Sequence, residues 1–415
     1  MSRLLLATPY LPHRRVGHGG GTAIRSQITY LARRHTVRVV SLVRPGEGDL
    51  VADTARELGA EVVPVPFLDR SAGPAARPRL WAARGAAALR SLARGTPFYV
   101  EKYRTPSWWE AVRRELARFR PDVLQCEYFQ SAWLLREARR AREAAGQAEP
   151  LLVLSSHELG SLPRLRAAAL AASPARAALL RRQAALWRRW QVAATEWADV
   201  TLCVTEQDRR LLAADGGRNC RTVPLGVDCR ENRSVWRPGN PPHLLFVGSF
   251  AHRPNRSAAL FLVDKVWPRI ANYSEDISLW LVGRGSRAFL DRLPRRDPRV
   301  RALGFVPDLE RLYRESRLFV APLLEGGGIK IKVLEAMARG IPVVTTPIGA
   351  EGIAGEEERT FWLAPGDERF AAAVRMALDD EQESARRATR ARRLAEDRFC
   401  WAAIMDRLAA IYERR

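Results

Sequence analysis

The chain has 415 residues, of which 47% are hydrophobic and 8% aromatic, and its formal net charge is +22. This length exceeds what one ordinary hydrophobic core needs, so we expect two domains. No apolar run approaches the ~18 residues of a membrane-spanning helix. The apolar run in residues 1–15 is short and cut by prolines, so we do not expect a secretory signal there. The five cysteines are odd in number and scattered, a pattern that supports neither a disulfide framework nor a zinc site and fits a reducing cytoplasm.

The positive charge is concentrated in two stretches of the N-terminal half. Residues 70–100 and 159–195 contain no acidic residue, but many arginines among alanines, leucines and tryptophans. Helices with an apolar and a basic side can lie on anionic lipid, where each cation contributes ~1 kcal/mol. We therefore expect a cytoplasmic protein attached to the inner face of the cell membrane. The alternative is arginines that only decorate solvated helices. Nucleic acid is not an expected partner, because the sequence contains no nucleic-acid motif.

In chain order, the first half alternates apolar strands with helices. Residues 3–11 are predicted as a strand, residues 12–23 as a glycine-rich loop and residues 24–35 as an amphipathic helix. Further buried strands are expected at 36–43, 60–67, 121–128, 150–158, 198–206 and 220–228. Continuously apolar strands between helices are typical of a parallel sheet that is covered on both faces.

The same alternation restarts after residues 228–242, a stretch rich in proline, glycine and asparagine that we interpret as a linker. Strands are predicted at 243–250, 277–285, 300–306, 316–323, 341–347 and 359–365. The fold class is therefore α/β, with two doubly wound, Rossmann-like domains facing each other across a cleft. The expected domains are residues 1–235 and 236–397, and an amphipathic helix at 398–415 is expected to pack back on the first.

The stretch PLLEGGGIKIKVLEAMARGIPVVTT, residues 322–346, holds two of the four lysines in a chain of 64 arginines. Its glycine run lies between a predicted strand and a helix expected at about 328–339. Glycines let backbone N–H groups approach an anion, and a helix N-terminus adds about half a positive charge. Lys332 and Glu335 share one helix face, whereas Lys330 points elsewhere.

Such a site presents amides and ammonium to phosphate, and a carboxylate one turn deeper to hydroxyl groups. A nucleoside diphosphate joined to a sugar has this order of groups. The alternative is a flexible glycine loop followed by solvated lysines.

The stretch resembles the nucleotide-sugar motif of retaining, family-4 glycosyltransferases (group 1) with the GT-B fold, in the branch whose loop reads GxGxKxK. Similar segments recur in the expected order along nearly the whole chain: GHGGGTAIRS, PDVLQCEYFQSAWLL, VLSSHE, ADVTLCVTEQD, VPLGVD, LLFVGSF, LWLVGRG, LGFVPDL and LAPGDERFAAAV. The resemblance implies sugar transfer from a nucleoside-diphosphate-sugar to a hydroxyl acceptor, with retention and without a metal or other cofactor. A lipid-linked or saccharide acceptor in envelope polysaccharide or glycolipid synthesis is expected.

The resemblance also implies which residues form the site. His157 would contact the donor sugar near the reacting carbon, and Glu335 would bind the ribose hydroxyls. The catalytic candidates are His157, Lys332 and Glu325. The candidates for nucleotide-sugar binding are Gly19, Gly20, Gly21, Gly248, Arg253, Gly326, Gly327, Gly328, Lys330, Lys332 and Glu335.

This sequence departs from the family pattern at the motif's first glutamate. Gly327 stands at that spacing from Glu335, and the nearest upstream acid is Glu325, so the role of Glu325 is left open. The usual phosphate-binding arginine and lysine after FVG are also missing. Their charge is expected on Lys330 and Lys332 instead.

Two other function classes remain open at this point. One is a GT-B sugar-nucleotide epimerase or hydrolase, which product analysis with and without an acceptor would distinguish. The other is a non-enzymatic protein that binds anionic polymers. The net charge is the only feature of the sequence that favours this function. The donor base, the sugar, the acceptor, the linkage and the oligomeric state cannot be read from the sequence.

Overall fold

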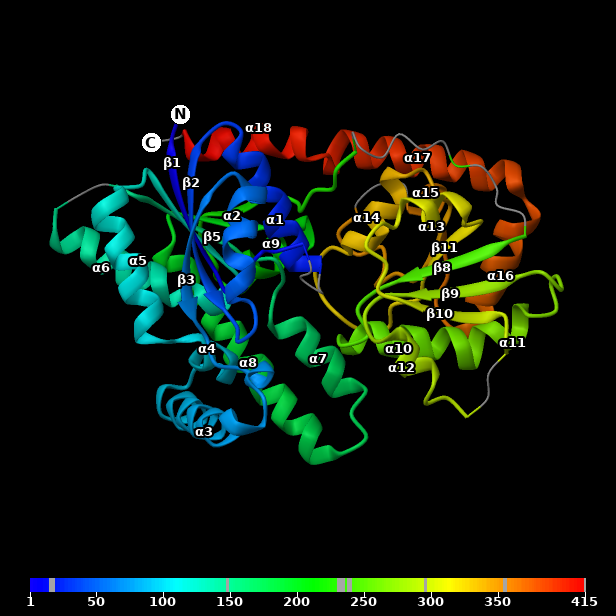
Figure 1. The fold of residues 1–415 in the computed structure, drawn as a ribbon, viewed down its shortest axis with the longest axis horizontal. Helices are drawn as coiled ribbons and strands as arrows, with labels where there is room; N and C mark the ends of the chain where they lie inside the picture. Colours follow the sequence, from blue (N-terminus) through cyan, green and yellow to red (C-terminus); the bar gives the residue numbers. More distant parts are fainter. Residues whose placement is uncertain are drawn as a thin grey trace. The chain divides into compact units, whose positions relative to one another are not determined.

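The computed structural model describes residues 1–14, 19–146, 149–229, 236, 241–294, 297–353 and 357–413. The chain divides into two compact units. Of the described residues, those from 1 to 14, from 20 to 224 and from 405 to 413 belong to the N-terminal unit, and Gly19 and those from 225 to 404 belong to the C-terminal unit. Each unit is built on one parallel sheet (Figure 1), which confirms the α/β class predicted from alternating strands and helices.

The sheet of the N-terminal unit has seven parallel strands in the order β3-β2-β1-β4-β5-β6-β7. Its strands are β1 (Arg3–Thr8), β2 (Thr36–Val43), β3 (Glu61–Pro66), β4 (Val123–Glu127), β5 (Leu151–Ser155), β6 (Val200–Cys203) and β7 (Cys220–Thr222). The strand order reverses between β1 and β4, which pair directly. In an open parallel sheet, this switch point is where the loops diverge and ligands bind.

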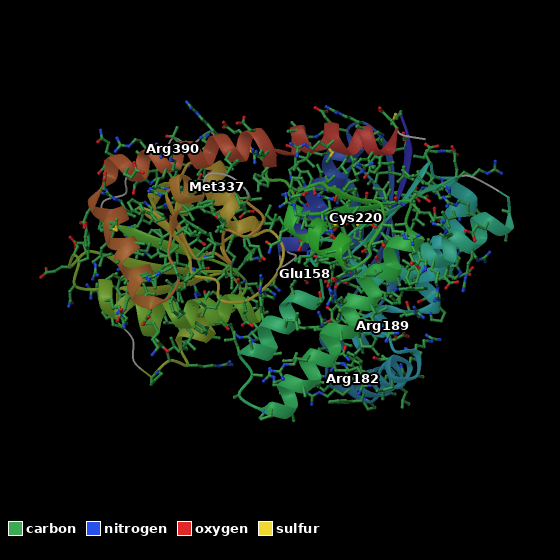
Figure 2. The ribbon with its side chains drawn as sticks, turned by 180° about the vertical axis from the view of Figure 1, so that it is seen from behind. Glu158, Arg182, Arg189, Cys220, Met337 and Arg390 are labelled. Atoms are coloured by element: carbon green, nitrogen blue, oxygen red, sulfur yellow. The ribbon has the colours of Figure 1, made fainter. Side chains whose placement is uncertain are left out.

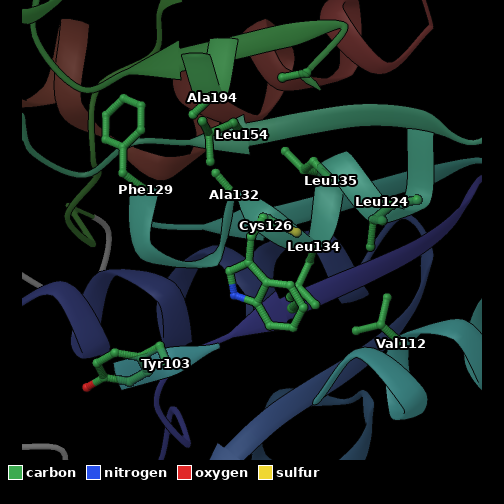
Figure 3. Close-up of a cluster of buried hydrophobic side chains, with 14 of the residues drawn as sticks. Tyr103, Val112, Leu124, Cys126, Phe129, Ala132, Leu134, Leu135, Leu154 and Ala194 are labelled. Atoms are coloured by element: carbon green, nitrogen blue, oxygen red, sulfur yellow. The ribbon is translucent and has the colours of Figure 1, made fainter. Parts of the chain in front are cut away.

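The helices of the N-terminal unit follow the strands in the chain. They are α1 (Gly19–Ala32), α2 (Val51–Leu58), α3 (Arg77–Arg94), α4 (Phe98–Tyr103), α5 (Pro106–Phe119), α6 (Trp133–Ala144), α7 (Ser161–Ala169), α8 (Pro174–Trp197) and α9 (Glu206–Ala214). Figure 3 shows the core where β4 and β5 meet α6. There Leu124, Cys126 and Leu154 of the sheet pack with Leu134 and Leu135 of the helix.

The start of α1 differs from the sequence prediction. The helix begins at Gly19, so the three glycines form its first turn, whereas they were expected in a loop before a helix at 24–35. Glycine has a low helix propensity. Here the buried Gly21, Ile24 and Ile28 lie on one face, and their packing outweighs that propensity.

The sheet of the C-terminal unit has six parallel strands in the order β10-β9-β8-β11-β12-β13. Its strands are β8 (His243–Val247), β9 (Ser278–Val282), β10 (Val300–Gly304), β11 (Leu318–Ala321), β12 (Val343–Thr345) and β13 (Trp362–Leu363). Its helices are α10 (Arg253–Phe261), α11 (Trp267–Ile270), α12 (Ser286–Leu290), α13 (Glu310–Glu315), α14 (Ile331–Ala338), α15 (Glu357–Thr360), α16 (Asp367–Asp379) and α17 (Glu381–Phe399). The switch point of this sheet lies between β8 and β11, which pair directly.

A last helix, α18 (Trp401–Tyr412), follows α17 after a break at Cys400, whose backbone is extended. Most of α18, from Met405 onward, belongs to the N-terminal unit. There Asp406 pairs with Arg34 at 2.9 Å. The predicted boundary between residues 235 and 236 falls among residues that are mostly outside the described ranges, and it stays a prediction. In the described part of the chain, every helix is too short or too polar to cross a membrane.

Candidate functional site

The glycine–lysine stretch lies at the switch point of the C-terminal unit. Strand β11 ends at Ala321 and α14 begins at Ile331, three residues later than the sequence predicted. The loop between them turns at Gly326 and Gly328, whose φ angles of 115° and 65° favour glycine. The chain therefore leaves the sheet through a tight, backbone-rich turn before the helix starts.

Lys330 closes this turn. It precedes the first helical residue with an extended backbone, φ −96° and ψ 90°. Its Nζ donates hydrogen bonds to the carbonyl oxygens of Gly327, at 3.2 Å, and Gly328, and lies 3.5 Å from the Glu351 carboxylate. The buried ammonium is thus directed back into the loop, where it links Gly327 and Gly328, two of the residues predicted to bind the nucleotide-sugar.

Lys332 occupies a different environment on the first turn of α14. Its Nζ donates to Oδ1 of Asn255 and lies 4.8 Å from the ring centre of Phe246. Burial, followed by the charge of Lys330, lowers the pKa of Lys332 to about 7, although the negative charge of Glu335 opposes the shift. This ammonium therefore lacks a full counter-charge, and a bound anion would favour its protonated form.

Gly248 completes this cluster from the end of β8. A Cβ atom at this position would lie 2.8 Å from the Asn255 side chain and 3.0 Å from Nζ of Lys332. A larger residue here would displace the Asn255 and Lys332 side chains from each other's reach. Asn255 in turn donates to the carbonyl of Ser249 at 2.9 Å. The structure therefore brings Gly248 and Lys332 together, as expected if both serve one site.

Glu335 lies one turn along α14 from Lys332. The hydroxyl of Tyr313 donates to its Oε2 at 3.5 Å. Burial raises the pKa of Glu335, while the positive charge of Arg339 lowers it. The carboxylate is thus held beside a phenol and is set deeper in the fold than a solvated helix charge would be.

Arg253 and Glu325 form a pair of their own. Arg253 begins α10, and its Nε lies 3.1 Å from Oε1 of the buried Glu325. The hydroxyl of Ser257 donates to the same oxygen at 2.8 Å. Arg253 keeps 42% of its side chain exposed, so it can still face a ligand, whereas Glu325 is committed to these two partners.

His157 is the predicted site residue of the N-terminal unit, two residues after β5. Its Nε2 lies 2.6 Å from Oε2 of the buried Glu127, and its ring stacks on Tyr128 with centroids 4.0 Å apart. Its φ of 57° is in the left-handed region, which is uncommon for a residue with a side chain. Its Nδ1 is buried and has no partner among the described residues.

A pocket lies beside His157, and the two neighbours of His157 in the sequence line it. Its empty space is about 480 Å³, counting its open mouth, and its walls are Tyr10, Tyr99, Tyr128, Phe129, Gln130, Ser156, Glu158, Gly160, Arg164 and Trp187. Arg164 lies 4.7 Å from the ring centre of Trp187 and donates to the carbonyl of Gly160 at 2.6 Å. Burial lowers the pKa of Arg164, and the charge of Glu158 (Figure 2) opposes that shift. Aromatic faces combined with charged groups suit a hydroxyl-bearing ring.

Gly19, Gly20 and Gly21 form the first turn of α1, as described above, and their approach to a ligand stays a prediction. Sequence reasoning missed Glu127, the partner of His157, and Asn255, the partner of Lys332. Glu127 had a readable signal, a carboxylate at the end of an apolar strand. Within the described ranges, we find no group of three or more histidine, cysteine or acidic side chains arranged to hold a metal ion.

Comparison with known families covers most of the chain. Residues 17–231 match the family described as Glycosyltransferase Family 4, and residues 241–380 match Glycosyl transferases group 1. A phosphatidyl-myo-inositol mannosyltransferase of Mycobacterium leprae is 26% identical over 220 residues, which are 51% of this chain and 58% of that protein. An uncharacterized 44.6 kDa protein in the cps region of Klebsiella pneumoniae is 26% identical over 164 residues, 34% of this chain and 42% of that protein. The chain spans about half the length of the curated relatives it matches.

Solved structures resemble the chain over its whole length. Sucrose-phosphate synthase from Thermosynechococcus elongatus has a TM-score of 0.68 at 16% identity and covers 99% of this chain and 98% of its own. HepE of Anabaena, in complex with UDP-glucose, has a TM-score of 0.63 at 14% identity, with 99% of each chain covered. At these identities the likeness concerns the fold, and the GT-B class predicted from the sequence is confirmed.

Proposed function

This chain belongs to glycosyltransferase family 4, and from that premise we propose that it transfers a sugar from a nucleoside-diphosphate donor to a hydroxyl acceptor. The observation that carries the proposal is the undercompensated ammonium of Lys332, held beside Gly248 and Asn255 at a switch point. A diphosphate supplies the charge that this position lacks. Because HepE is a structural neighbour solved with UDP-glucose, a UDP-sugar is the first donor to test.

Lys332 would act on the leaving group. As the bond between sugar and phosphate breaks, negative charge grows on the diphosphate, so a preorganised cation stabilises the transition state more than the bound substrate. We include in the proposal that no metal is needed and that configuration is retained. Same-face attack, with the departing phosphate assisting removal of the acceptor proton, requires no protein nucleophile.

His157 and Glu325 would have different parts in this reaction. The unpartnered Nδ1 of His157 supports the expected contact with the donor sugar, because it is a hydrogen-bonding group that the protein leaves unused. Glu325 already accepts hydrogen bonds from Ser257 and Arg253. We infer that Glu325 positions Arg253 for the diphosphate, rather than touching the transferred sugar.

We propose that the acceptor binds in the aromatic pocket beside His157. Tyr128 and Trp187 offer ring faces for the apolar face of a sugar or cyclitol, and Glu158 and Arg164 offer partners for its hydroxyls. The mannosyltransferase relative is named for a phosphatidyl-inositol acceptor, and the Klebsiella relative for a cps region. The mannosyltransferase name supports a lipid-linked acceptor. We propose that the acceptor is lipid-linked or a saccharide, in envelope polysaccharide or glycolipid synthesis.

Calorimetry with UDP, GDP and UDP-glucose tests the donor side, because ligands that bind the folded state also raise its melting temperature. We expect UDP or GDP to bind and the matching sugar nucleotide to be consumed faster when a hydroxyl acceptor is present. Binding without any turnover, or binding of neither nucleotide, would contradict the proposal. Release of a free or epimerised sugar that is unaffected by acceptors would identify a hydrolase or epimerase instead.

We further propose attachment to an anionic membrane surface through α3. Its exposed Trp81, Leu89 and Leu92, at 68%, 70% and 61% exposure, fall within about 80° of one another around the helix. On α3, Arg77 and Arg84 lie beside this face, and on α8 the side chains of Arg182 and Arg189 are exposed (Figure 2). An apolar face with cationic flanks fits anionic lipid.

Co-sedimentation with vesicles measures this attachment. We expect binding to vesicles that contain phosphatidylglycerol, little binding to pure phosphatidylcholine, and loss of binding in Trp81→Ala combined with Leu92→Ala. The exposed Leu260→Ala, in the C-terminal unit, is the control. Equal binding to both kinds of vesicle, or to neither, would contradict the attachment.

A further inference from the structure

Four buried side chains form a continuous hydrogen-bonded series in the N-terminal unit, which we call the His157 network. The hydroxyl of Tyr412 donates to Oε1 of Gln125 at 2.6 Å. Nε2 of Gln125 donates to Oε1 of Glu127 at 2.5 Å, and the other oxygen of Glu127 lies 2.6 Å from Nε2 of His157. The series leads from the last turn of α18, through β4, to the predicted catalytic histidine.

Each link of the network has a fixed direction. Burial raises the pKa of Tyr412, the charge of Glu127 adds to that shift and a hydrogen bond with the Gln27 side chain opposes it, so the phenol keeps the proton that it donates to Gln125. Because the amide oxygen of Gln125 accepts this proton, its NH₂ group must face Glu127. Glu127 is a carboxylate that accepts from Gln125 on one oxygen, and its other oxygen is then free to accept from His157.

The direction of the network determines which nitrogen of His157 is free. Glu127 fixes the proton of neutral His157 on Nε2, so Nδ1 carries an unshared electron pair. Nδ1 is the buried atom that has no partner among the described residues. The ring is also fixed in orientation, by stacking on Tyr128 and by the left-handed backbone at position 157.

We propose that Tyr412, Gln125 and Glu127 are positioning residues that hold His157 in the Nε2–H tautomer, with Nδ1 available to accept a hydrogen bond from a sugar hydroxyl. This inference rests on the proposed function only for the identity of the group that Nδ1 meets. Its structural part concerns the tautomer and can be measured without turnover. The helix that completes the site is α18, more than 240 residues away from His157 in the sequence.

Tyr412→Phe is the direct test, because it removes one hydroxyl and keeps the ring that fills the same space. Nitrogen NMR of protein labelled at its six histidines reports the tautomer of His157, which His157→Ala assigns. We expect the wild-type spectrum to show the Nε2–H form. Tyr412→Phe should show a mixture of both tautomers, because Gln125 loses its anchor and Glu127 is then free to turn away from Nε2 of His157. With UDP-glucose as the probe, kcat/KM should fall about threefold to tenfold while the Kd for UDP is unchanged.

Two further variants keep the test decisive. Gln125→Met has a similar length and removes both bonds at the middle of the network, so it should reproduce the tautomer change if Tyr412→Phe does not fold. Leu408→Ala lies on the same buried face of α18 and weakens its packing without touching the network. It should lower the melting temperature and leave the tautomer of His157 intact.

The outcomes separate this inference from the proposed function. A tautomer that stays Nε2–H in both Tyr412→Phe and Gln125→Met would overturn the inference, whatever the activity. A tautomer change in these variants, together with a wild-type protein that turns over no sugar nucleotide, would leave the network standing and contradict the glycosyltransferase assignment. A tautomer change in Leu408→Ala of the same size would show that packing, not the network, holds the ring.

Discussion

The two units share the same order over six parallel strands, yet the carboxyl ends of their central strands carry opposite chemistry. In the C-terminal unit, glycines and a lysine with a depressed pKa surround the end of β8. In the N-terminal unit, a carboxylate–histidine pair and a wall of tyrosines surround the end of β4. A doubly wound sheet therefore fixes where a ligand can bind, and the loops decide whether the place suits an anion or a hydroxyl-bearing ring.

The difference extends to how each unit treats a buried polar group. Among the described residues, the ammonium of Lys332 donates to the neutral Asn255 and is only partly compensated by Glu335, so it favours the arrival of an anion. Glu127 has its two oxygens engaged by neighbouring side chains, so it favours a single arrangement of His157. One site is open to a charged ligand, and the other is rigid. The following changes test this contrast.

Lys332→Ala should have the largest effect. It removes a charge-assisted bond to phosphate worth ~1.5–3 kcal/mol, so kcat/KM for the sugar nucleotide should fall by at least about tenfold, through kcat as well as KM. Lys332→Arg should rescue poorly, because a planar guanidinium does not fit beside Gly248 and Asn255. Lys265→Ala, at an exposed lysine, is the control. Near-normal kinetics in Lys332→Ala would show that the C-terminal unit does not bind the diphosphate through this lysine.

The affinity for UDP should depend on pH through Lys332. A pKa of about 7 in the free protein means that the ammonium form, which phosphate prefers, is lost as pH rises above 7. Calorimetry should show UDP affinity falling roughly tenfold from pH 6 to pH 8, since each unit above the pKa costs ~1.4 kcal/mol. Lys332→Ala gives the baseline for titration of UDP itself. Identical pH profiles for both proteins would mean that Lys332 does not contact the phosphate.

His157→Ala should separate the two sites. UDP has no sugar, so its Kd should stay within about twofold of wild type, while kcat/KM for UDP-glucose falls about tenfold with the lost hydrogen bond. His35→Ala, at a histidine of the same unit outside the site, is the matched control. Weakened UDP binding in His157→Ala, but not in His35→Ala, would show that His157 contacts the nucleotide. The assignment of the nucleotide to one site and the sugar to the other would then be wrong.

Glu335→Ala should mainly raise the donor KM, by about fivefold, because ribose contacts change little during the reaction. Glu335→Gln keeps a hydrogen-bond acceptor for Tyr313 and should recover part of the affinity. Steady-state kinetics with both variants distinguishes a binding role from a catalytic one. An equal loss in kcat would place the carboxylate at the reacting atoms instead.

Lys330→Ala should have the smallest effect on catalysis and a clear effect on stability. Because its ammonium is bonded to the carbonyls of Gly327 and Gly328, we expect a change in kcat/KM of about twofold and a melting temperature lowered by about 2–4 °C. Scanning calorimetry measures the melting temperature, with Lys265→Ala as the control variant. A kinetic loss as large as in Lys332→Ala would show that Lys330 also faces the phosphate.

The sheets could be predicted well from the sequence, because buried strands are recognisable as apolar runs bounded by turn residues. It failed where tertiary packing decides. Gly19 begins a helix despite its low propensity, and Lys330 lies outside the helix that a helical projection had assigned to it. The partners Asn255 and Glu127 were missed, since they meet Lys332 and His157 only after the chain has crossed the sheet. Periodicity carries no information about such distant pairs.

The return of α18 to the N-terminal unit also affects how the protein is made. Residues 1–224 leave the ribosome long before residues 405–413, and synthesis of the intervening residues takes on the order of tens of seconds. During this time Gln125 has no Tyr412, and the surface that Leu408 and Met405 later cover is open to water. Until α18 has been synthesised, the nascent N-terminal unit therefore exposes an apolar surface. Chaperones bind surfaces of this kind.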